Sequence, residues 1–221
     1  MQVLGKGVYG LMLAARLTRL RPRRVREWFR GRTRTDVAAT MFQSDYPSTD
    51  GTLSISFHDL IEAFVAGQLR ERGVSLQRVR KVHAQLQTRW GTRHPFCRRE
   101  ILTSEDDNVF TYGLDDEGHR EMVEVLSRQR VFPDILLPFL SKIDYDRTSD
   151  LAIRWRIAES VVIDPAICFG KPIVQEVGIA TSVLAASYRA NNQDAELVAD
   201  WFRVHARHVL AAVDFERGLA A

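Results

Sequence analysis

The sequence of 221 residues has little that would place it in or across a membrane. No apolar run approaches the roughly 18–20 residues that a membrane-spanning helix needs. The first apolar stretch is interrupted at Arg16 before any small-residue cleavage site, so no signal peptide is predicted. Only two cysteines occur, Cys97 and Cys168, and their wide separation suits a reducing compartment better than a disulfide scaffold. These absences predict a cytoplasmic protein without membrane contacts.

Nucleotide-binding motifs are incomplete. The stretch GKGVYG, residues 5–10, has the glycine spacing of a dinucleotide-binding turn, but only four residues precede it, too few for the buried strand that such a turn follows. We therefore expect these glycines to form a flexible lead into the first helix. The stretch GKP, residues 170–172, lacks the upstream glycine of a phosphate-binding loop and has proline where the metal-binding hydroxyl belongs.

Metal-binding and catalytic motifs are lacking as well. His94 and Cys97, like His205 and His208, have the spacing of metal ligands, but no second pair of comparable quality completes either set. There is no nucleophile elbow and no clear acid–base pair. The sequence therefore predicts no catalytic residue, no metal site and no cofactor, and an enzyme is the least favoured class of function.

Charge is unevenly distributed along the chain. Residues 1–100 contain 19 Lys and Arg against 8 Asp and Glu, whereas residues 101–221 contain 12 against 20. The two parts therefore have net charges of +11 and −8. Such a division indicates that the first part meets an anionic partner and that the second part has a different role.

The densest positive charge lies in AARLTRLRPRRVREWFRGRTR, residues 14–34, which contains nine arginines. Apolar spacing predicts a helix from Val8 to Leu20, followed by a second helix that begins at Pro22 and ends at Gly31. Two short helices joined by a tight turn are typical of a helix-turn-helix.

The second of these helices has two different faces. Its apolar face consists of Val25, Trp28 and Phe29. The opposite face has arginines at positions i, i+3 and i+7, namely Arg23, Arg26 and Arg30. The aromatic face would hold this arginine stripe rigidly against the rest of the domain.

The stripe has two interpretations. In the simpler one it is a solvated helix face, but only Glu27 offsets the ten basic residues that precede Thr35. Unpaired arginines repel one another unless a partner neutralises them, and a guanidinium can form two parallel hydrogen bonds with a phosphate or a guanine. Duplex DNA is the favoured partner because its major groove admits a helix, whereas A-form RNA hides its bases from one.

The remaining pattern predicts a mainly helical chain. Residues 33–54 are polar and rich in turn residues, as in a wing or a loose loop. Ser56 and Asp59 predict a capping box on a helix that Gly73 stops, and Ser75 opens another helix that ends near Gly91. The other predicted elements are a hairpin in residues 99–113, a helix from Glu117 to Arg128, a strand over residues 151–157, and helices over residues 182–190, 195–203 and 206–217.

Two stretches resemble known families. Residues 9–31, YGLMLAARLTRLRPRRVREWFRG, resemble the N-terminal helix-turn-helix of MerR-like regulators, and residues 55–86 resemble the helices that follow it there. The tail, residues 160–216, resembles domain-of-unknown-function family 433. The motifs that carry this second resemblance are Asp164-Pro165, Gly-Lys-Pro-Ile at 170–173, a small-residue turn at 177–181 and a terminal helix-turn-helix at 194–216.

The head departs from the MerR-like pattern at the turn between its two helices. Arg19 replaces the turn glycine, and Arg21 replaces the usual Ser or Thr cap before Pro22. An arginine side chain cannot accept hydrogen bonds from the first backbone N–H groups of a helix, so the sequence leaves the geometry of this turn open.

Proteins that pair these two regions resemble the antitoxins of VapBC-type toxin–antitoxin systems. The resemblance implies a homodimer that binds its own operator as a repressor and neutralises a PIN-like ribonuclease toxin.

Two rival functions remain. One is a MerR-like regulator that senses a small molecule in a pocket lined by Phe110, Tyr112, Phe132 and Phe139. The other is a protein-interaction module that does not bind DNA.

The sequence therefore predicts a mainly α fold with minor β structure in three parts. These are a winged or MerR-like helix-turn-helix head (1–100), an α/β connector (101–150) and a family-433-like C-terminal helical domain with short strands (151–221), with the last boundary near residues 145–150.

The predicted DNA contacts are Arg19, Arg21, Arg23, Arg24, Arg26, Arg30, Arg32 and Arg34. A second set of DNA or dimer contacts consists of Lys171, His205, Arg207 and His208; because the last helix is only weakly basic, we expect it to pack or dimerise rather than to read DNA.

Overall fold

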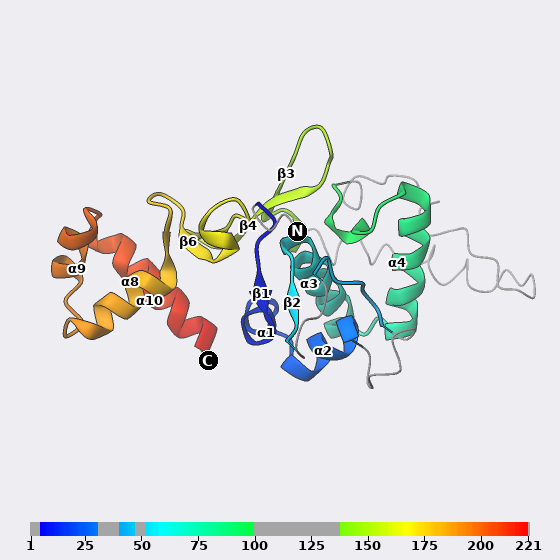
Figure 1. Ribbon diagram of the computed structural model, residues 1–221, viewed down its shortest axis with the longest axis horizontal. Helices are drawn as coiled ribbons and strands as arrows, with labels where there is room; N and C mark the ends of the chain where they lie inside the picture. Colours follow the sequence, from blue (N-terminus) through cyan, green and yellow to red (C-terminus); the bar gives the residue numbers. More distant parts are fainter. Residues whose placement is uncertain (1–4, 31–39, 47–51, 100–137, 221) are drawn as a thin grey trace, which may run out of the picture.

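The structure is a computed structural model, and it describes residues 5–30, 40–46, 52–99 and 138–220. Helices gather at the two ends of an elongated molecule, with an antiparallel sheet between them (Figure 1). Apart from Arg99, the predicted hairpin in residues 99–113 lies outside the described residues, as do the predicted helix from Glu117 to Arg128, Arg32 and Arg34. What is described is mostly helical with a smaller amount of strand, as predicted.

The head, the described part of residues 5–99, consists mainly of four helices. Its elements are β1 (Tyr9–Gly10), α1 (Leu11–Thr18), α2 (Pro22–Arg30), β2 (Ser54–Ile55), α3 (Phe57–Glu71), α4 (Leu76–Trp90) and the 3-10 turn η2 (Pro95–Cys97). All four helices were predicted. The first begins three residues later than expected, because Tyr9 and Gly10 pair as an antiparallel strand with Ile55 and Ser54.

Local signals set the ends of α3 and α4. The Ser56 side chain accepts a hydrogen bond from the Asp59 backbone N–H (3.1 Å), and the Asp59 carboxylate accepts one from the Ser56 N–H (3.0 Å). The predicted capping box is thus confirmed. Ser75 caps α4 by accepting from the Arg78 N–H, and Gly91 ends that helix in the left-handed conformation (φ 58°).

The prediction that residues 5–10 form a flexible lead is wrong. Gly7 is buried with a positive φ of 66°, and its carbonyl accepts a 2.5 Å hydrogen bond from the Tyr46 hydroxyl. The Lys6 carbonyl accepts from the Phe57 N–H (2.8 Å), and the Val8 N–H donates to the Phe169 carbonyl (3.0 Å). The segment is therefore held between the rest of the head and the turn at residues 168–170. The sequence pattern missed this because every partner lies far away along the chain.

The apolar face of α2 packs into the head as predicted. Val25 is fully buried, and Trp28 and Phe29 are 3% and 6% exposed. The Phe42 ring contacts both aromatic rings, with centroids 6.0 Å from Trp28 and 5.3 Å from Phe29. The backbone N–H groups of Met41 and Phe42 also donate to the Trp28 carbonyl. Residues 41–46 therefore fix the C-terminal half of α2 against the core.

A five-stranded antiparallel sheet follows in the order of the chain. Its strands are β3 (Ile143–Tyr145), β4 (Ala152–Ala158), β5 (Val161–Ile163), β6 (Pro172–Val174) and β7 (Ile179–Ala180). The predicted strand over residues 151–157 is confirmed as β4. Trp155 of β4 packs against Phe64 of α3 with a centroid distance of 4.5 Å, so this part of the sheet belongs to the core of the head. The predicted domain boundary near residues 145–150 falls on the turn between β3 and β4.

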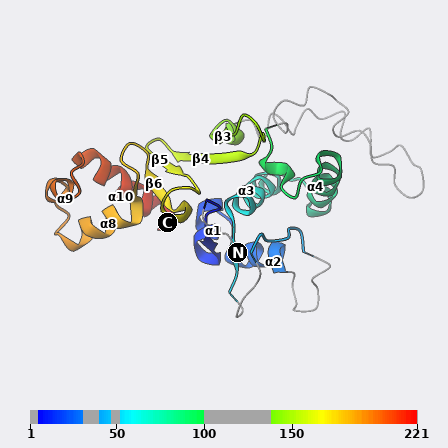
Figure 2. The ribbon, with the colours of Figure 1, turned by 45° about the horizontal axis from the view of Figure 1, so that its top comes forward.

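The tail ends in three helices, α8 (Thr181–Ala190), α9 (Ala195–Phe202) and α10 (Ala206–Ala220), all of which were predicted. They enclose a second core, and Figure 2 shows the sheet lying between them and the head. Phe215 and Leu219 of α10 reach the core of the head. None of the described helices is long and apolar enough to span a membrane.

Candidate nucleic-acid interface and a histidine–aspartate cluster

The turn between α1 and α2 closes despite its arginine. Arg19 adopts the left-handed conformation (φ 56°, ψ 30°) at the end of α1, where glycine is usual. Its N–H donates to the Arg16 carbonyl (3.2 Å), and the Leu20 N–H donates to the Ala15 carbonyl (2.9 Å). These bonds satisfy carbonyls at the helix end, and the Arg19 side chain is exposed. The question that the sequence left open is thus answered: the turn is tight, with a left-handed arginine.

The predicted DNA contacts that lie within the described residues differ in their surroundings. Arg19, Arg21, Arg23, Arg24 and Arg26 are exposed, whereas Arg30 is half-buried. Arg23 forms a 2.9 Å ion pair with Glu27, one turn along the same helix. Arg30 donates to the Thr52 carbonyl, which places it against the segment before β2. The end of the predicted stripe therefore also has a structural contact.

Apart from the Arg23–Glu27 pair, the arginines on the exposed face of α1 and α2 have no ion pair within the described residues. In the described part of the chain, no carboxylate pairs with Arg16, Arg19, Arg21, Arg24 or Arg26. An exposed i,i+4 pair such as Arg23–Glu27 contributes only about 0.3–0.5 kcal/mol, so a phosphate can displace it at little cost. We call the exposed arginines Arg19, Arg21, Arg23, Arg24 and Arg26 the basic face.

The second set of predicted contacts lies on the tail. Lys171 and His205 are exposed. Arg207 and His208 both bond one carboxylate oxygen of Glu176, at 2.8 and 2.9 Å, and the His208 side chain is almost fully buried. The hydrogen bond from His208 and the positive charge of Arg207 lower the pKa of Glu176. Arg207 and His208 thus tie α10 to the turn between β6 and β7.

The aromatic residues of the predicted small-molecule pocket are only partly described. Phe110, Tyr112 and Phe132 lie outside the described residues. Phe139 packs against Phe64, with a centroid distance of 5.8 Å, and under the guanidinium of Arg72 at 4.6 Å. Phe139 is therefore part of the packing around α3.

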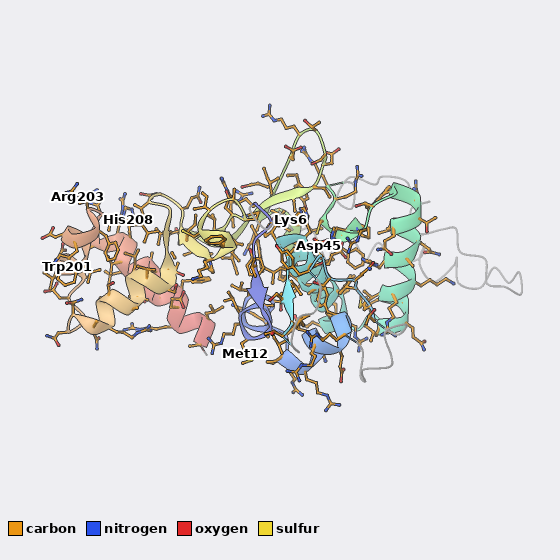
Figure 3. All side chains as sticks on the ribbon, in the orientation of Figure 1. Lys6, Met12, Asp45, Trp201, Arg203 and His208 are labelled. Atoms are coloured by element: carbon orange, nitrogen blue, oxygen red, sulfur yellow. The ribbon has the colours of Figure 1, made fainter. Side chains whose placement is uncertain are left out.

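A cleft of about 670 Å³ lies between the head and the sheet. Its lining includes the charged or titratable side chains Lys6, Asp45, His58, Arg93, His94 and Arg154. Figure 3 places Lys6 and Asp45 close together on the head, well away from Trp201, Arg203 and His208 of the tail. Arg154 of β4 forms a 2.8 Å ion pair with Asp164, which belongs to the same lining.

Three potential metal ligands converge on the wall of this cleft. One atom from each of Asp45, His58 and His94 lies within 4.8 Å of the other two. Asp45 comes from the segment before β2, His58 from the first turn of α3, and His94 from the residue that precedes η2. We call these three residues the histidine–aspartate cluster.

Hydrogen bonds and burial shift the pKa values of the cluster. The Asp45 carboxylate accepts from Ser56 Oγ (2.7 Å) and lies 3.2 Å from His94 Nε2, and the hydrogen bond with His94 holds the pKa of Asp45 well below its usual range. Burial opposes a charge on His94, but the bond to Asp45 and the nearby carboxylates outweigh it and raise the pKa of His94. Burial lowers the pKa of His58.

The sequence did not predict this cluster. It paired His94 with Cys97, but Cys97 is fully buried and its thiol donates to the His58 carbonyl at 3.2 Å. The three clustered residues are separated by 13 and 36 positions, so no short motif links them. His58 lies two residues after the helix cap Ser56, but no sequence signal links it to Asp45 or His94.

Comparisons with known proteins cover the tail by sequence and the whole chain by fold. Residues 161–215, from β5 into α10, match the family described as "Protein of unknown function (DUF433)". No curated protein sequence matches the chain. The X-ray crystal structure of Rv2018 from Mycobacterium tuberculosis is similar, with a TM-score of 0.72 and 22% identity over 93% of this chain and 96% of that one. The predicted resemblance of the tail to family 433 is confirmed, and the chain shares the overall fold of the mycobacterial protein.

Proposed function

We propose that this chain is a DNA-binding antitoxin that represses its own operon. The observation that carries the proposal is the basic face, which consists of exposed arginines in the turn after α1 and on α2. Trp28 and Phe29, on the opposite face of α2, are buried in the core of the head and fix the position of this helix. The tight turn at Arg19 fixes the angle between α1 and α2. A rigid short helix with arginines on its outer side is the kind of element that enters a major groove.

The charges on this face suit a nucleic acid better than an acidic protein surface. Five exposed guanidinium groups lie on about 8 consecutive residues, and phosphates are spaced regularly along both strands of a duplex. Arg23 and Arg26 lie one turn apart on α2, so both can face the groove, while Arg19 and Arg21 in the turn can reach the backbone.

The antitoxin part of the proposal rests on the resemblance of the head and tail together to VapBC-type antitoxins. In that arrangement the chain would form a homodimer with two heads on half-sites about 34 Å apart or a multiple of that distance. The acidic second part of the chain would cover basic surface on a PIN-like ribonuclease. The cytoplasm is the compartment where such a complex would act.

The DNA-binding part is tested with the full chain and a labelled duplex from upstream of its own gene. Each phosphate contact contributes about −0.9 to the slope of log affinity against log salt concentration. We expect R23A/R26A to weaken binding about 30-fold or more and to reduce the slope by about 2, because each lost arginine contact is worth about 1–3 kcal/mol.

The matched control is R147A/R189A, which removes the same charge from exposed positions on the β3–β4 turn and on α8. It should leave affinity within a few-fold of the wild type. Equal effects of the two double variants would mean that only net charge matters, and the proposed face would be wrong. A wild-type affinity that is flat with salt would also overturn the proposal, and an absence of duplex binding at low salt would favour the interaction module.

The antitoxin part is tested separately by co-expression with the product of the neighbouring reading frame. We expect a PIN-like ribonuclease to co-purify with the chain and to lose its activity in the complex. R23A/R26A should still inhibit the ribonuclease, because the basic face is assigned to DNA. An active ribonuclease in the presence of the folded chain would refute the antitoxin role and leave the DNA-binding result standing.

A further inference from the structure

The histidine–aspartate cluster has a donor set that the proposed function does not use. It combines two imidazole rings and one carboxylate from three separate segments, with one atom of each within 4.8 Å of the others. The His94 Nε2 and an Asp45 oxygen are already 3.2 Å apart. Ligand atoms around a tetrahedral zinc ion lie roughly 3.4 Å apart when the bonds are about 2.0–2.2 Å long. The ligand atoms therefore need to approach one another by at most about 1.4 Å around an ion.

The surrounding hydrogen bonds orient the ligands in the way that metal sites require. His58 Nε2 lies 3.0 Å from the Ala152 carbonyl, which can only accept, so Nε2 is the donor and Nδ1 has the free lone pair of the neutral ring. The second oxygen of Asp45 is held by Ser56 Oγ at 2.7 Å. A ligating histidine usually donates its other N–H to a carbonyl or carboxylate, and a ligating carboxylate is itself hydrogen-bonded.

His94 shows that the hydrogen bonding of the cluster is incomplete. Its Nδ1 is buried and makes no hydrogen bond within the described residues, and the nearest carboxylate oxygen, from Asp59, is 3.9 Å away. A buried ring nitrogen without a partner is costly, typically about 1–3 kcal/mol. A simple Asp45–His94 ion pair leaves this atom unsatisfied. A bound ion allows the ring to turn, so that one nitrogen ligates the ion while the other approaches the Asp59 carboxylate.

We propose that Asp45, His58 and His94 form a binding site for a divalent metal ion of the zinc class. Two nitrogens and one oxygen suit Zn²⁺, and three protein ligands leave a fourth position for water or another donor. That position faces the cleft, whose lining also includes Lys6, Arg93 and Arg154. An oxygen donor of a small anion is therefore the natural fourth ligand.

Such an ion would join three elements that the head must hold in place. It would connect residues 41–46 with the start of α3 and with the α4–η2 connection. The same residues 41–46 support α2 through the bonds from Met41 and Phe42 to the Trp28 carbonyl. The ion would thus stabilise the folded head, and a ligand that binds only the folded state raises the stability by RT ln(1 + [L]/Kd).

The test uses the full chain, stripped of metal with a chelator, and Zn²⁺ or Co²⁺ alone as the probe. We expect one ion per chain by calorimetric titration, a visible absorption band of four-coordinate Co²⁺, and a melting temperature that rises with Zn²⁺. H58Q, H94Q and D45N should each lower Zn²⁺ affinity by about 100-fold or more, and S56A, which removes a positioning residue, by about 10-fold.

The matched control is H205Q, which makes the same change at an exposed tail histidine and should leave affinity unchanged. If a ligand variant does not fold, the imidazole NMR signals of the wild type still decide, because Zn²⁺ should perturb only two of its six histidines. No saturable binding, equal affinity in the ligand variants and the wild type, or perturbation of other histidines would overturn the proposal. The metal site and the DNA interface are tested independently. If Zn²⁺ binds as expected but R23A/R26A binds DNA as tightly as the wild type, this inference stands and only the proposed DNA interface is refuted.

Discussion

Single residues decide the geometry of the basic face, and Arg19 is the clearest case. A non-glycine residue in the left-handed region costs roughly 1–2 kcal/mol. Arg19 has φ 56°, and its side chain is exposed and forms no ion pair with another described residue. The sequence raised the right question here, because the departure from glycine was visible. The sequence alone could not show whether the turn closes, because the cost of the left-handed arginine is balanced by helix packing. That packing involves Leu20 and Val25, both of which are buried in the core.

We therefore expect R19G to stabilise the protein by about 1 kcal/mol, because glycine adopts this conformation without steric cost while its greater freedom in the unfolded chain offsets part of the gain. Chemical denaturation of the full chain measures the change. The control is R16G, which removes the same charge from inside α1 and should destabilise by about 1 kcal/mol. A destabilised R19G would show that the arginine side chain stabilises the turn.

Elements were predicted where a local cap marks them and missed where they depend on distant partners. Ser56, Ser75 and Asp194 each cap the helix that follows, and all three helices were predicted. In contrast, β1 and β2 have two residues each and exist only because segments 45 residues apart in the sequence pair with each other. A strand of two residues is too short to show a periodic pattern, so the sequence predicted residues 5–10 to be a flexible lead into the first helix.

The start of α3 also depends on a partner outside the helix. Asp45 accepts from Ser56 Oγ and pairs with His94 at 3.2 Å and Arg93 at 3.4 Å. Its folded pKa is lowered, so the stability that it contributes is present above its ordinary pKa of 3.8 and is lost as the pH falls below that value. The carboxylate therefore stabilises the junction of three segments at neutral pH.

We expect D45N to destabilise the protein by about 2 kcal/mol at pH 7 in the presence of a chelator, since hydrogen bonds to charged groups are worth about 1.5–3 kcal/mol. The difference from the wild type should shrink as the pH falls below about 4, where the wild-type carboxyl becomes protonated in the unfolded chain. Urea denaturation at several pH values measures it. A difference that is constant down to pH 3 would mean that the charge of Asp45 is not the cause.

At the scale of the whole molecule, the sequence separated a head, a connector and a tail, and the structure joins head and tail through contacts that no local pattern reveals. Trp155 and Ile163 of the sheet lie in the core of the head, together with Tyr9. The tail turn CFG, residues 168–170, lies against the segment around Gly7 and Tyr9. Such a contact between residues 160 positions apart can be found only when the fold is known, and the same holds for the histidine–aspartate cluster.

Gly170 is where this contact is tightest. It has a φ of 80°, and a Cβ at this position would lie 2.3 Å from the Tyr9 hydroxyl oxygen and 3.0 Å from the Gly7 Cα. Tyr9 is fully buried, so its ring cannot move aside without disturbing the core of the head. A side chain at position 170 would therefore push the tail turn away from the head. This movement would also lengthen or break the hydrogen bond from the Val8 N–H to the Phe169 carbonyl.

We expect G170A to destabilise the full chain by about 2–4 kcal/mol, which combines left-handed strain of about 1 kcal/mol with overpacking of about 1–3 kcal/mol. The control is G178A, which has a similar φ of 66° with nothing within 4 Å of the added Cβ and should cost only the strain. Thermal and urea unfolding of both variants give the comparison. If the two variants lose the same stability, the contact between Gly170 and Tyr9 does not hold the tail to the head, and other contacts, such as those of Phe215 and Leu219 of α10 with the core of the head, do so.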